Sequence, residues 1–310
     1  MPVAGLSHVA GYIPAERPSL SELREALEIS EAELRVLIQS HGLCRIAVEN
    51  KLRVHEMIGV AVDLLFEGRA ELAGEIGLIL CTSTFPAFVP YLFDPFAGMQ
   101  RKWGMERAEV RFVSQLNCAS LDFLFRLARL WTERRGSGVL VLAADKMGLP
   151  RSRYLQDSTV SADAAAAAVV TKTAACNRIV GSAVQSNASV YNSMQASPEE
   201  YAWFQNTFTV GLVKALRDVL QQAGVTAERL RYVFPANVNR GTWQRVADAS
   251  GVPFERFYFP TMAEIGHAHN ADPLLNAEHA LRHGMLQPGD LFATLTVGMG
   301  STFGCTLFRH

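Results

Sequence analysis

Residues 110–143 read VRFVSQLNCASLDFLFRLARLWTERRGSGVLVLA, and this stretch decides the fold. It begins with an apolar run at 110–113 and continues into a helical pattern at 120–131. A glycine turn then leads to a second apolar run at 139–143. Short apolar runs bounded by turn residues are typical of buried strands. The order therefore predicts strand, loop, helix and strand, with Cys118 in the loop.

A later stretch of the chain has the same order of features. It has an apolar run, a loop that contains His267, a helical pattern, a glycine turn and a final apolar run. We interpret the two stretches as a weak internal repeat. A duplicated α/β unit would place Cys118 and His267 at equivalent loop ends, where a shared pocket could form between the halves. The predicted elements of this second unit are strands at 257–259 and 291–297 and a helix at 274–283.

Strand and helix patterns also alternate elsewhere in the chain. Further strands are predicted at 76–81, 167–170 and 232–234, and a further helix at 208–222. The alanine run 164–168 continues into apolar residues, so we interpret it as packed structure. Alternating strands and helices predict an α/β architecture with buried sheets.

The composition limits the class of protein. The chain has 310 residues, of which 49% are hydrophobic and 19% are charged, and its formal net charge is −1. This length fits one large α/β domain or two ordinary ones. The charge balance predicts neither a nucleic-acid nor an anionic-membrane partner. No window of eighteen apolar residues and no signal-peptide pattern are present, so we predict a cytoplasmic protein without a membrane span.

The cysteines do not form a metal or disulfide pattern. They are odd in number, and none is part of a CxxC pair. Scattered cysteines of this kind fit a reducing compartment. Most are expected to be structural thiols; they are Cys44, Cys81, Cys118, Cys176 and Cys305.

Cys118 is the candidate nucleophile. It follows a predicted strand and precedes a helix that begins near Ala119 or Ser120. The positive end of the helix dipole favours the thiolate, which is the nucleophilic form of cysteine. Position alone leaves the alternative open that this thiol is a small buried hydrophobic group.

The segment 266–273, GHAHNADP, contains a candidate base. His267 lies beside a helix start, and Asp272 could orient its ring. Asp272 could instead, or in addition, cap the helix that begins at Pro273. His269 is the less favoured base, because only its proximity supports it. A metal site needs more ligands than this stretch offers, so we predict none.

Two further loops offer weaker signals. The stretch 297–304, VGMGSTFG, contains three glycines that allow inward-pointing amides for an oxyanion or a phosphate. A lone glycine cluster is weak evidence, and an ordinary β-turn is the favoured interpretation. After the strand at 232–234, Asn239 could donate to a thioester carbonyl. Spacing alone favours a polar turn there.

Taken in order, the motifs of this chain resemble those of the ketoacyl-ACP synthase III family of the thiolase superfamily. The resemblance covers nearly the whole chain, and each motif is short. Several in the right order are specific, and they identify Cys118 as the nucleophile. The motifs are GYIP at 11–14, GLCR at 42–45, TST at 82–84, NC at 117–118, SADAA at 161–165, NVNR at 237–240, PGD at 288–290, the glycine turn and FRH at 308–310.

The resemblance implies a five-layered α-β-α-β-α thiolase fold built from two similar halves. The first half, 1–172, would carry the nucleophilic cysteine, and the second, 173–310, the histidine and asparagine residues and the glycine turn. It also implies a homodimer and an acyl-cysteine formed from acyl-CoA or an acyl carrier protein. No cofactor is predicted.

The resemblance assigns roles position by position. Cys118 matches the family's cysteine, and the backbone amides of Cys118 and Met299 match its oxyanion hole. Asn239 stands at the asparagine of the His-x-x-Asn motif. Two positions depart from the pattern: Ala236 replaces the histidine of that motif, and His267 replaces the asparagine of a Gly-Asn motif. Alanine cannot donate a hydrogen bond, which argues against decarboxylative condensation.

The Gly-His…Asp-Pro form resembles a side branch of secondary metabolism that includes acyltransferases. We therefore expect the acyl group of Cys118 to pass to an unknown acceptor, with His267 as base and Asp272 as its partner, in polyketide or other secondary metabolism. Carbon–carbon condensation and a non-catalytic partner subunit remain alternatives. Ala236 could also be an engineered replacement of histidine.

An aromatic segment follows the motif at 82–84. It could line an acyl pocket, although core packing or a dimer interface is the plainer interpretation. Its members are Phe85, Phe88, Tyr91, Phe93 and Phe96.

Overall fold

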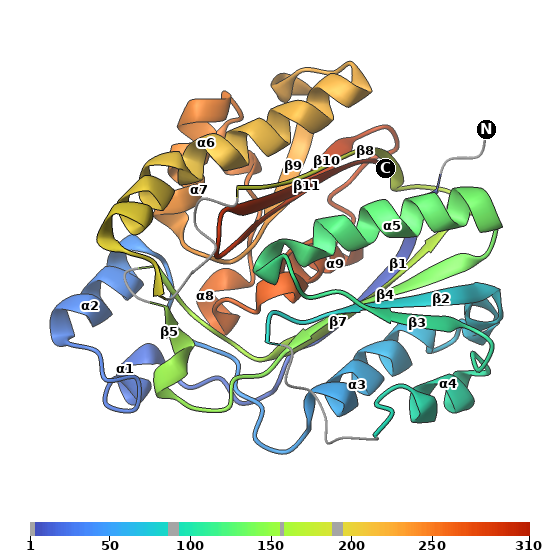
Figure 1. Ribbon diagram of the computed structural model, residues 1–310, viewed down its shortest axis with the longest axis horizontal. Coiled ribbons are helices and arrows are strands. Elements are labelled where there is room, and N and C mark those ends of the chain that lie inside the picture. Colours follow the sequence, from blue (N-terminus) through green and yellow to red (C-terminus); the bar gives the residue numbers. More distant parts are fainter. Residues whose placement is uncertain (1–3, 86–92, 156–157, 188–194) are drawn as a thin grey trace.

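The computed structural model describes residues 4–85, 93–155, 158–187 and 195–310 (Figure 1). The strands are Gly5–Tyr12 (β1), Ile76–Thr82 (β2), Glu109–Phe112 (β3), Gly138–Asp145 (β4), Tyr154–Leu155 (β5), Thr159–Val160 (β6), Ala164–Thr171 (β7), Arg178–Ser186 (β8), Leu230–Pro235 (β9), Leu291–Gly298 (β10) and Thr302–Arg309 (β11). The α-helices are Leu20–Leu23 (α1), Glu31–Arg35 (α2), Val54–Phe66 (α3), Ala97–Trp103 (α4), Ser120–Arg135 (α5), Pro198–Ala223 (α6), Arg240–Ser250 (α7), Met262–Ile265 (α8) and Asp272–Arg282 (α9).

The large sheet contains the same strand arrangement twice. Its order is β3-β2-β4-β7-β1-β8-β11-β10-β9, and β1 meets β8 through the single pair Gly5–Arg178. On one side of this joint, β2 pairs with β4 in parallel, and β4 and β1 both pair with β7 antiparallel. On the other side, β9 pairs with β10 in parallel, and β10 and β8 both pair with β11 antiparallel. This repetition is the structural form of the weak repeat in the sequence.

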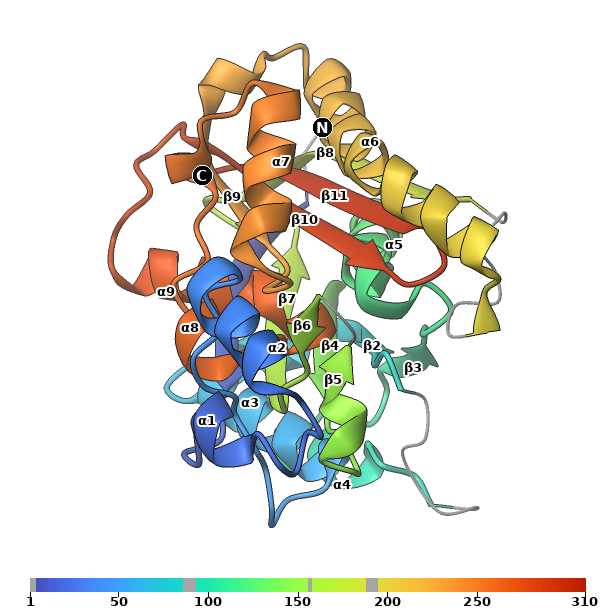
Figure 2. The same ribbon diagram turned by 90° about the vertical axis from the view of Figure 1, so that its left-hand side faces the viewer.

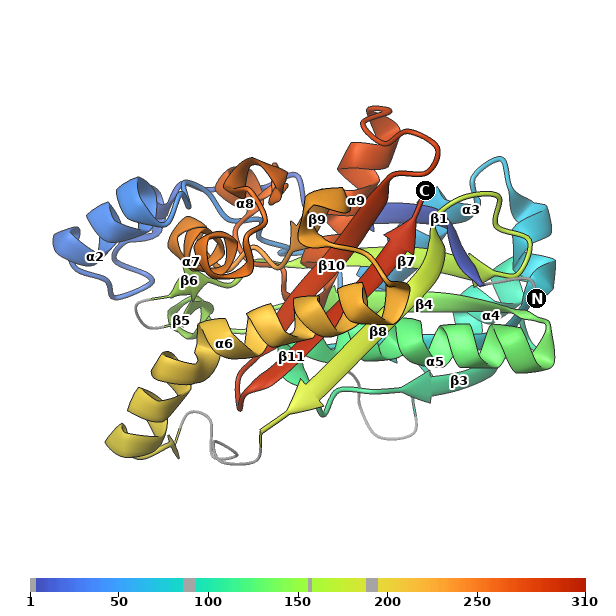
Figure 3. The ribbon, with the colours of Figure 1, turned by 90° about the horizontal axis from the view of Figure 1, so that it is seen from above.

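The helices form three layers around the two parts of the sheet (Figures 1 and 3). Helix α3 packs on β1, β4 and β7 from outside. Helices α5 and α9 contact strands of both parts and so lie between them. Helix α6 covers β8, β10 and β11 and also packs on α7. The predicted five-layered α-β-α-β-α fold is therefore confirmed.

The boundary between the predicted halves 1–172 and 173–310 falls between β7 and β8. The short N-terminal helices pack on the second half, near α7 and α8 (Figure 2). There the backbone amides of Cys44 and Arg45 both donate to the carbonyl of Ala263. The two halves thus share contacts beyond the joint of the sheet, and their division into domains stays a prediction.

Most predicted elements are present, and one strand prediction is wrong. Strands β2, β4, β7, β9 and β10 and helices α5 and α6 cover the predicted ranges, whereas β3 and α9 each end one residue before the predicted end. Residues 257–259 form no strand and make only one bridge, from Phe257 to Val233. Pro253 and Pro260 flank this run, and proline cannot donate to a strand ladder. Its aromatic side chains pack instead on neighbouring rings, such as Phe257 on Trp243.

Helix α6 begins ten residues before its predicted start at 208. Ser197 forms a capping box with Glu200, and Pro198 occupies the first turn. The helix ends at Gly224, whose φ of 64° is left-handed. Among the helices in the described part of the chain, none is long and apolar enough to span a bilayer.

Candidate active site

Cys118 lies at the start of α5, as the sequence predicts. It belongs to a 3₁₀ turn, Asn117–Ala119, that leads directly into the helix at Ser120. Asn117 has a left-handed φ of 50°, and its Nδ2 donates to the carbonyl of Met299 over 2.9 Å. The side chain of Cys118 is buried but lines a cavity, so it is accessible to a ligand that enters there.

His267 and Asp272 form a buried pair beside this thiol. Nδ1 of His267 lies 2.6 Å from Oδ2 of Asp272. The carboxylate also accepts from the backbone amides of Ala268 at 2.8 Å and Asn237 at 2.7 Å. The alternative that Asp272 caps α9 is wrong, because Ala271 precedes the helix and no side chain caps it.

The environment of His267 strongly favours its protonated form. Burial by itself lowers the pKa of a histidine, because it disfavours the charged ring. The Asp272 carboxylate, with a smaller contribution from Cys118, outweighs this effect and raises the pKa of His267 to about 10. Near neutral pH, His267 is therefore an imidazolium that faces the sulfur.

His269 also contacts the sulfur, which the sequence analysis did not favour. Its Nδ1 lies 3.2 Å from Sγ of Cys118, and its ring centroid lies 4.5 Å from that of His267. Burial, the charge of His267 and that of Arg153 hold the pKa of His269 well below its ordinary value. This ring is therefore neutral. Its Nε2 has no hydrogen-bond partner among the described residues. We infer that the ring proton lies on Nδ1 and points at Sγ.

The left-handed backbone of His269 brings its ring to the sulfur. Its φ is 54°, an uncommon value for a residue other than glycine. Asn117 and Ser301 have left-handed φ angles too, and both flank the same site. Backbone strain of this kind gathers at functional sites. The sequence offers no signal for these angles, so His269 could not have been singled out from it.

Thr84 and Asn270 hold the sulfur from the other side. Nδ2 of Asn270 donates to Oγ1 of Thr84 at 3.2 Å, and that hydroxyl donates to Sγ of Cys118 at 3.5 Å. Oδ1 of Asn270 accepts from the amide of Leu121 in the first turn of α5. Asp145 fixes Thr84 by accepting from its amide at 2.7 Å. The buried Asp145 has a pKa raised to about 7, because burial outweighs its hydrogen bonds.

The loop after β10 touches the cysteine loop. A side chain at Gly298 would place its Cβ 2.4 Å from the carbonyl oxygen of Leu116, so only glycine allows this approach. Met299 follows and lines the same cavity as Cys118. The structure thus brings together the two segments whose amides are predicted to hold the oxyanion.

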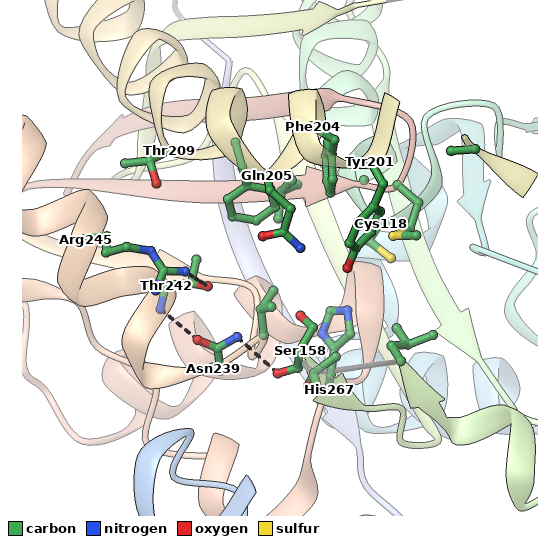
Figure 4. A pocket seen from close by; sticks show the side chains of 18 of the residues that line it. Cys118, Ser158, Tyr201, Phe204, Gln205, Thr209, Asn239, Thr242, Arg245 and His267 are labelled. Atoms are coloured by element: carbon green, nitrogen blue, oxygen red, sulfur yellow. Dashed lines mark hydrogen bonds between the residues drawn. The ribbon is translucent and has the colours of Figure 1, made fainter. Parts of the chain in front are cut away.

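A cavity of about 550 Å³ opens in front of Cys118 and His267 (Figure 4). Aromatic side chains of α6 line part of its wall: Tyr201, Phe204 and Phe208. Polar side chains, which include Thr209 and Arg245, line the part on the far side from Cys118. The cavity is therefore partly apolar, with hydrogen-bonding groups away from the sulfur.

The structure places Asn239 at the cavity wall, but its side chain is engaged. Oδ1 caps α7 by accepting from the amide of Thr242 at 2.7 Å. Nδ2 donates to the carbonyl of Ser158 at 3.0 Å. Ala236 is completely buried among apolar side chains, and its carbonyl accepts from Nε1 of Trp243. Cys118, His267 and Asp272 therefore come together. Asn239 lines the same cavity, but its amide contacts Ser158 and the start of α7.

The aromatic segment is divided in the structure. Phe96 is buried in the core around α3, and Phe93 packs on His55. Phe85 meets the ring of His269 edge to face, with centroids 5.3 Å apart. Phe88 and Tyr91 lie outside the described residues.

Three potential metal ligands also meet at this site. The ligand atoms of Cys118, His267 and His269 all lie within 4.8 Å of one another. The sequence-based prediction of no metal site counted only the loop 266–273. The cysteine comes from a segment about 150 residues away, so the ground for that prediction does not hold.

Comparison with known proteins agrees with this fold. Residues 220–310 match the family described as 3-oxoacyl-[acyl-carrier-protein (ACP)] synthase III, C terminal. The chain is 31% identical to the β-ketoacyl-[acyl-carrier-protein] synthase III of Rhizorhabdus wittichii over 32% of its length, and this match spans 31% of that relative. It is 23% identical to the synthase III of Neisseria meningitidis over the full length of both chains.

Solved structures show the same fold at lower identity. The structure titled "ChlB3 [Aceyltransferase]" has a TM-score of 0.87 and 20% identity, and covers 99% of this chain and 98% of its own. The 3-oxoacyl-[acyl-carrier-protein] synthase III of Aquifex aeolicus has a TM-score of 0.86 and 18% identity, with 99% and 100% covered.

Proposed function

Because this chain is a thiolase-superfamily protein related to ketoacyl-ACP synthase III, we propose that it is an acyltransferase that carries its acyl group on Cys118. The donor would be an acyl-CoA or an acyl carrier protein. One observation carries the proposal: a cysteine at a helix start shares a cavity with a histidine that a buried carboxylate holds.

The first step loads the cysteine. The Cys118 thiolate attacks the carbonyl carbon of the donor thioester, and the backbone amides of Cys118 and Met299 stabilise the oxyanion. The bond to the donor sulfur then breaks. The His267 imidazolium gives its proton to the departing thiolate, which leaves as a neutral thiol. An acyl-cysteine and a neutral His267 remain.

The second step transfers the acyl group to an acceptor alcohol or amine. Neutral His267 takes the proton of the acceptor, whose oxygen or nitrogen attacks the acyl-cysteine carbonyl. The bond to Sγ breaks and the Cys118 thiolate returns beside a protonated His267. Asp272 holds the ring of His267 in one orientation through both steps, and Nδ1–H of His269 donates to the thiolate.

Ala236 and His267, the two positions that depart from the family pattern, support acyl transfer over condensation. Ala236 is sealed in the core and carries no donor. The amide of Asn239 is bound to Ser158 and α7. Ala236 therefore offers no donor for the thioester oxygen of a malonyl unit. His267 supplies a base instead, which direct transfer requires.

Condensation remains a second candidate function, because the full-length match is to a β-ketoacyl-[acyl-carrier-protein] synthase III. In that case His267 would have to replace the donor missing at Ala236. Release of carbon dioxide from a malonyl carrier protein, dependent on Cys118, would favour this candidate over acyl transfer.

A homodimer and a role in polyketide or other secondary metabolism belong to the same proposal. The edge strand β3 leaves one side of the sheet unpaired among the described strands. Such an edge can pair with a second copy of the chain. The Gly-His…Asp motif at 266–272 supports the metabolic role.

Intact-mass spectrometry after incubation with a series of acyl-CoAs tests the acyl-enzyme. We expect a gain of one acyl mass in the wild type and in Cys44→Ala, which changes an exposed cysteine, and no gain in Cys118→Ala. Equal gain in Cys118→Ala, or no gain with any acyl-CoA or acyl carrier donor, would remove the proposal.

A further inference from the structure

The three-residue cluster around Cys118 has the donor set of a metal site. It combines one sulfur and two imidazoles, and these side chains are buried. Nδ1 of His267 is bound to Asp272, so Nε2 is the atom this ring can offer. His269 already presents Nδ1 to Sγ at 3.2 Å. The three donor atoms thus lie close enough together to share one cation.

We propose that Cys118, His267 and His269 bind one zinc-class divalent cation, and that the bound cation blocks acylation of Cys118. Thiolate and imidazole donors suit zinc, which takes four ligands in a tetrahedron. Sites with three protein ligands leave the fourth position open. Here that position faces the cavity, because Cys118 and His267 line it.

The residues around the cluster are arranged as in metal sites. A histidine ligand commonly donates its other ring N–H to a carboxylate, which fixes the ring and strengthens the donor. Asp272 has that position toward His267 and is itself held by the amides of Ala268 and Asn237. The ring proton of His269, which lies on Nδ1 in the absence of metal, would move to Nε2 when Nδ1 binds the cation.

The same sulfur cannot hold a cation and an acyl group at once. Zinc would therefore act as a reversible inhibitor that competes with the acyl donor, and it takes no part in the acyl-transfer steps. Conversely, an enzyme already acylated on Cys118 would lose its thiolate ligand and release the cation.

Titration with Co²⁺, a spectroscopic substitute for zinc, tests the site without any acyl donor. We expect one equivalent to produce the visible bands of tetrahedral cobalt and a thiolate-to-cobalt charge-transfer band. Cys118→Ser should lose the charge-transfer band, and His269→Gln should bind at least tenfold more weakly. Cys44→Ala and His283→Gln change an exposed thiol and an exposed imidazole and should match the wild type.

Two results would overturn the inference. One is the absence of a charge-transfer band at one equivalent of Co²⁺ in the folded wild type. The other is a band that persists in Cys118→Ser. Circular dichroism confirms that each variant is folded, and His269→Gln provides a second test should Cys118→Ser unfold.

Mass spectrometry with zinc then separates this inference from the proposed function. Where the acyl-enzyme forms, one equivalent of Zn²⁺ should abolish the mass gain and EDTA should restore it. Undiminished acylation with zinc present contradicts the inference alone. A cobalt site in a protein that no acyl donor modifies supports the inference and contradicts the proposed function.

Discussion

Nδ1 of His269 lies 3.2 Å from Sγ of Cys118, while the neighbouring His267 is paired with Asp272. Two histidines two residues apart in the sequence thus lie beside one sulfur, one of them protonated and the other neutral. Asp272 raises the pKa of His267, whereas burial and the charge of His267 lower that of His269. Pairs of titratable groups with pKa values driven apart are typical of acid–base sites. The arrangement gives a proton carrier and a separate neutral donor.

Loss of the His269 donor should slow acylation without abolishing it. A hydrogen bond to a charged group contributes about 1.5–3 kcal/mol, so His269→Ala should reduce the acylation rate by roughly 10- to 100-fold. Rapid-quench mass spectrometry of acyl-cysteine formation measures this. His279→Ala is a matched control, because that histidine lies in α9 and contacts Tyr258. An unchanged rate in His269→Ala would show that the contact with Sγ does not assist the thiolate.

Asp272→Asn should lower the rate of acyl transfer and change how that rate depends on pH. Without the carboxylate charge, the pKa of His267 falls and the ring loses its fixed orientation. We expect the transfer rate to drop by about 10²- to 10⁴-fold, as for other oriented bases. Steady-state rates across pH measure the change. A rate within a factor of two of the wild type at every pH would contradict the role of Asp272.

The same pair predicts how stability varies with pH. The folded pKa of His267, about 10, lies above its ordinary value of 6.5. Its contribution to the free energy of unfolding is therefore fully present below pH 6.5 and is lost as the pH rises through about 10. The Tm of the wild type should fall over this window relative to that of His267→Gln. Parallel curves for the two proteins would show that the His267–Asp272 pair adds no such stability.

The sequence predicts the strands and helices of this molecule better than the contacts within its active site. Buried strands such as β4 and β7 are continuous apolar runs, so they stand out. Strand β11 could not be separated from the glycine turn that precedes it, and the run 257–259 imitates a strand although prolines bound it. Cys118 and His267 could be predicted, because each lies in a loop just before a predicted helix. His269 reaches the sulfur only through its left-handed φ, and the amide of Asn239 is occupied by contacts that no spacing reveals.

Two substitutions of Asn239 separate its structural role from its predicted catalytic one. Asn239→Ala removes the cap of α7 and should cost about 1 kcal/mol of stability. Asn239→Ser keeps a capping oxygen but has no amide, so it should keep most of that stability. If the amide takes part in catalysis, both variants should lose acyl transfer equally. Thermal melts and transfer rates of the pair distinguish the two roles, and full activity in Asn239→Ser would contradict the catalytic one.

Introducing histidine at position 236 should not create a condensing enzyme. Ala236 is completely buried, and its carbonyl is held by Trp243, so a larger side chain must displace the core. Overpacking of this kind typically costs 1–3 kcal/mol. We expect Ala236→His to have a lower Tm and to release no additional carbon dioxide from a malonyl carrier protein. Decarboxylation that rises with an unchanged Tm would show that the position still opens on the cavity.

Gly298→Ala tests the predicted oxyanion hole through the backbone. The added Cβ would lie 2.4 Å from the carbonyl oxygen of Leu116, which belongs to the cysteine loop. Because two atoms cannot remain this close, the loop must move away from Cys118, and the backbone amide of Met299 moves with it. Loss of one oxyanion donor typically costs 10²- to 10³-fold in rate. We expect acylation to fall by about that factor. Gly59→Ala, in α3, should acylate at the wild-type rate, because a Cβ at Gly59 would meet no other atom within 4 Å. Reaction of Cys118 with iodoacetamide forms no oxyanion, so it should slow far less than acylation in Gly298→Ala. Equal loss in both reactions would mean that the substitution damages the thiol itself, and the assignment of Met299 to the oxyanion hole would then be wrong.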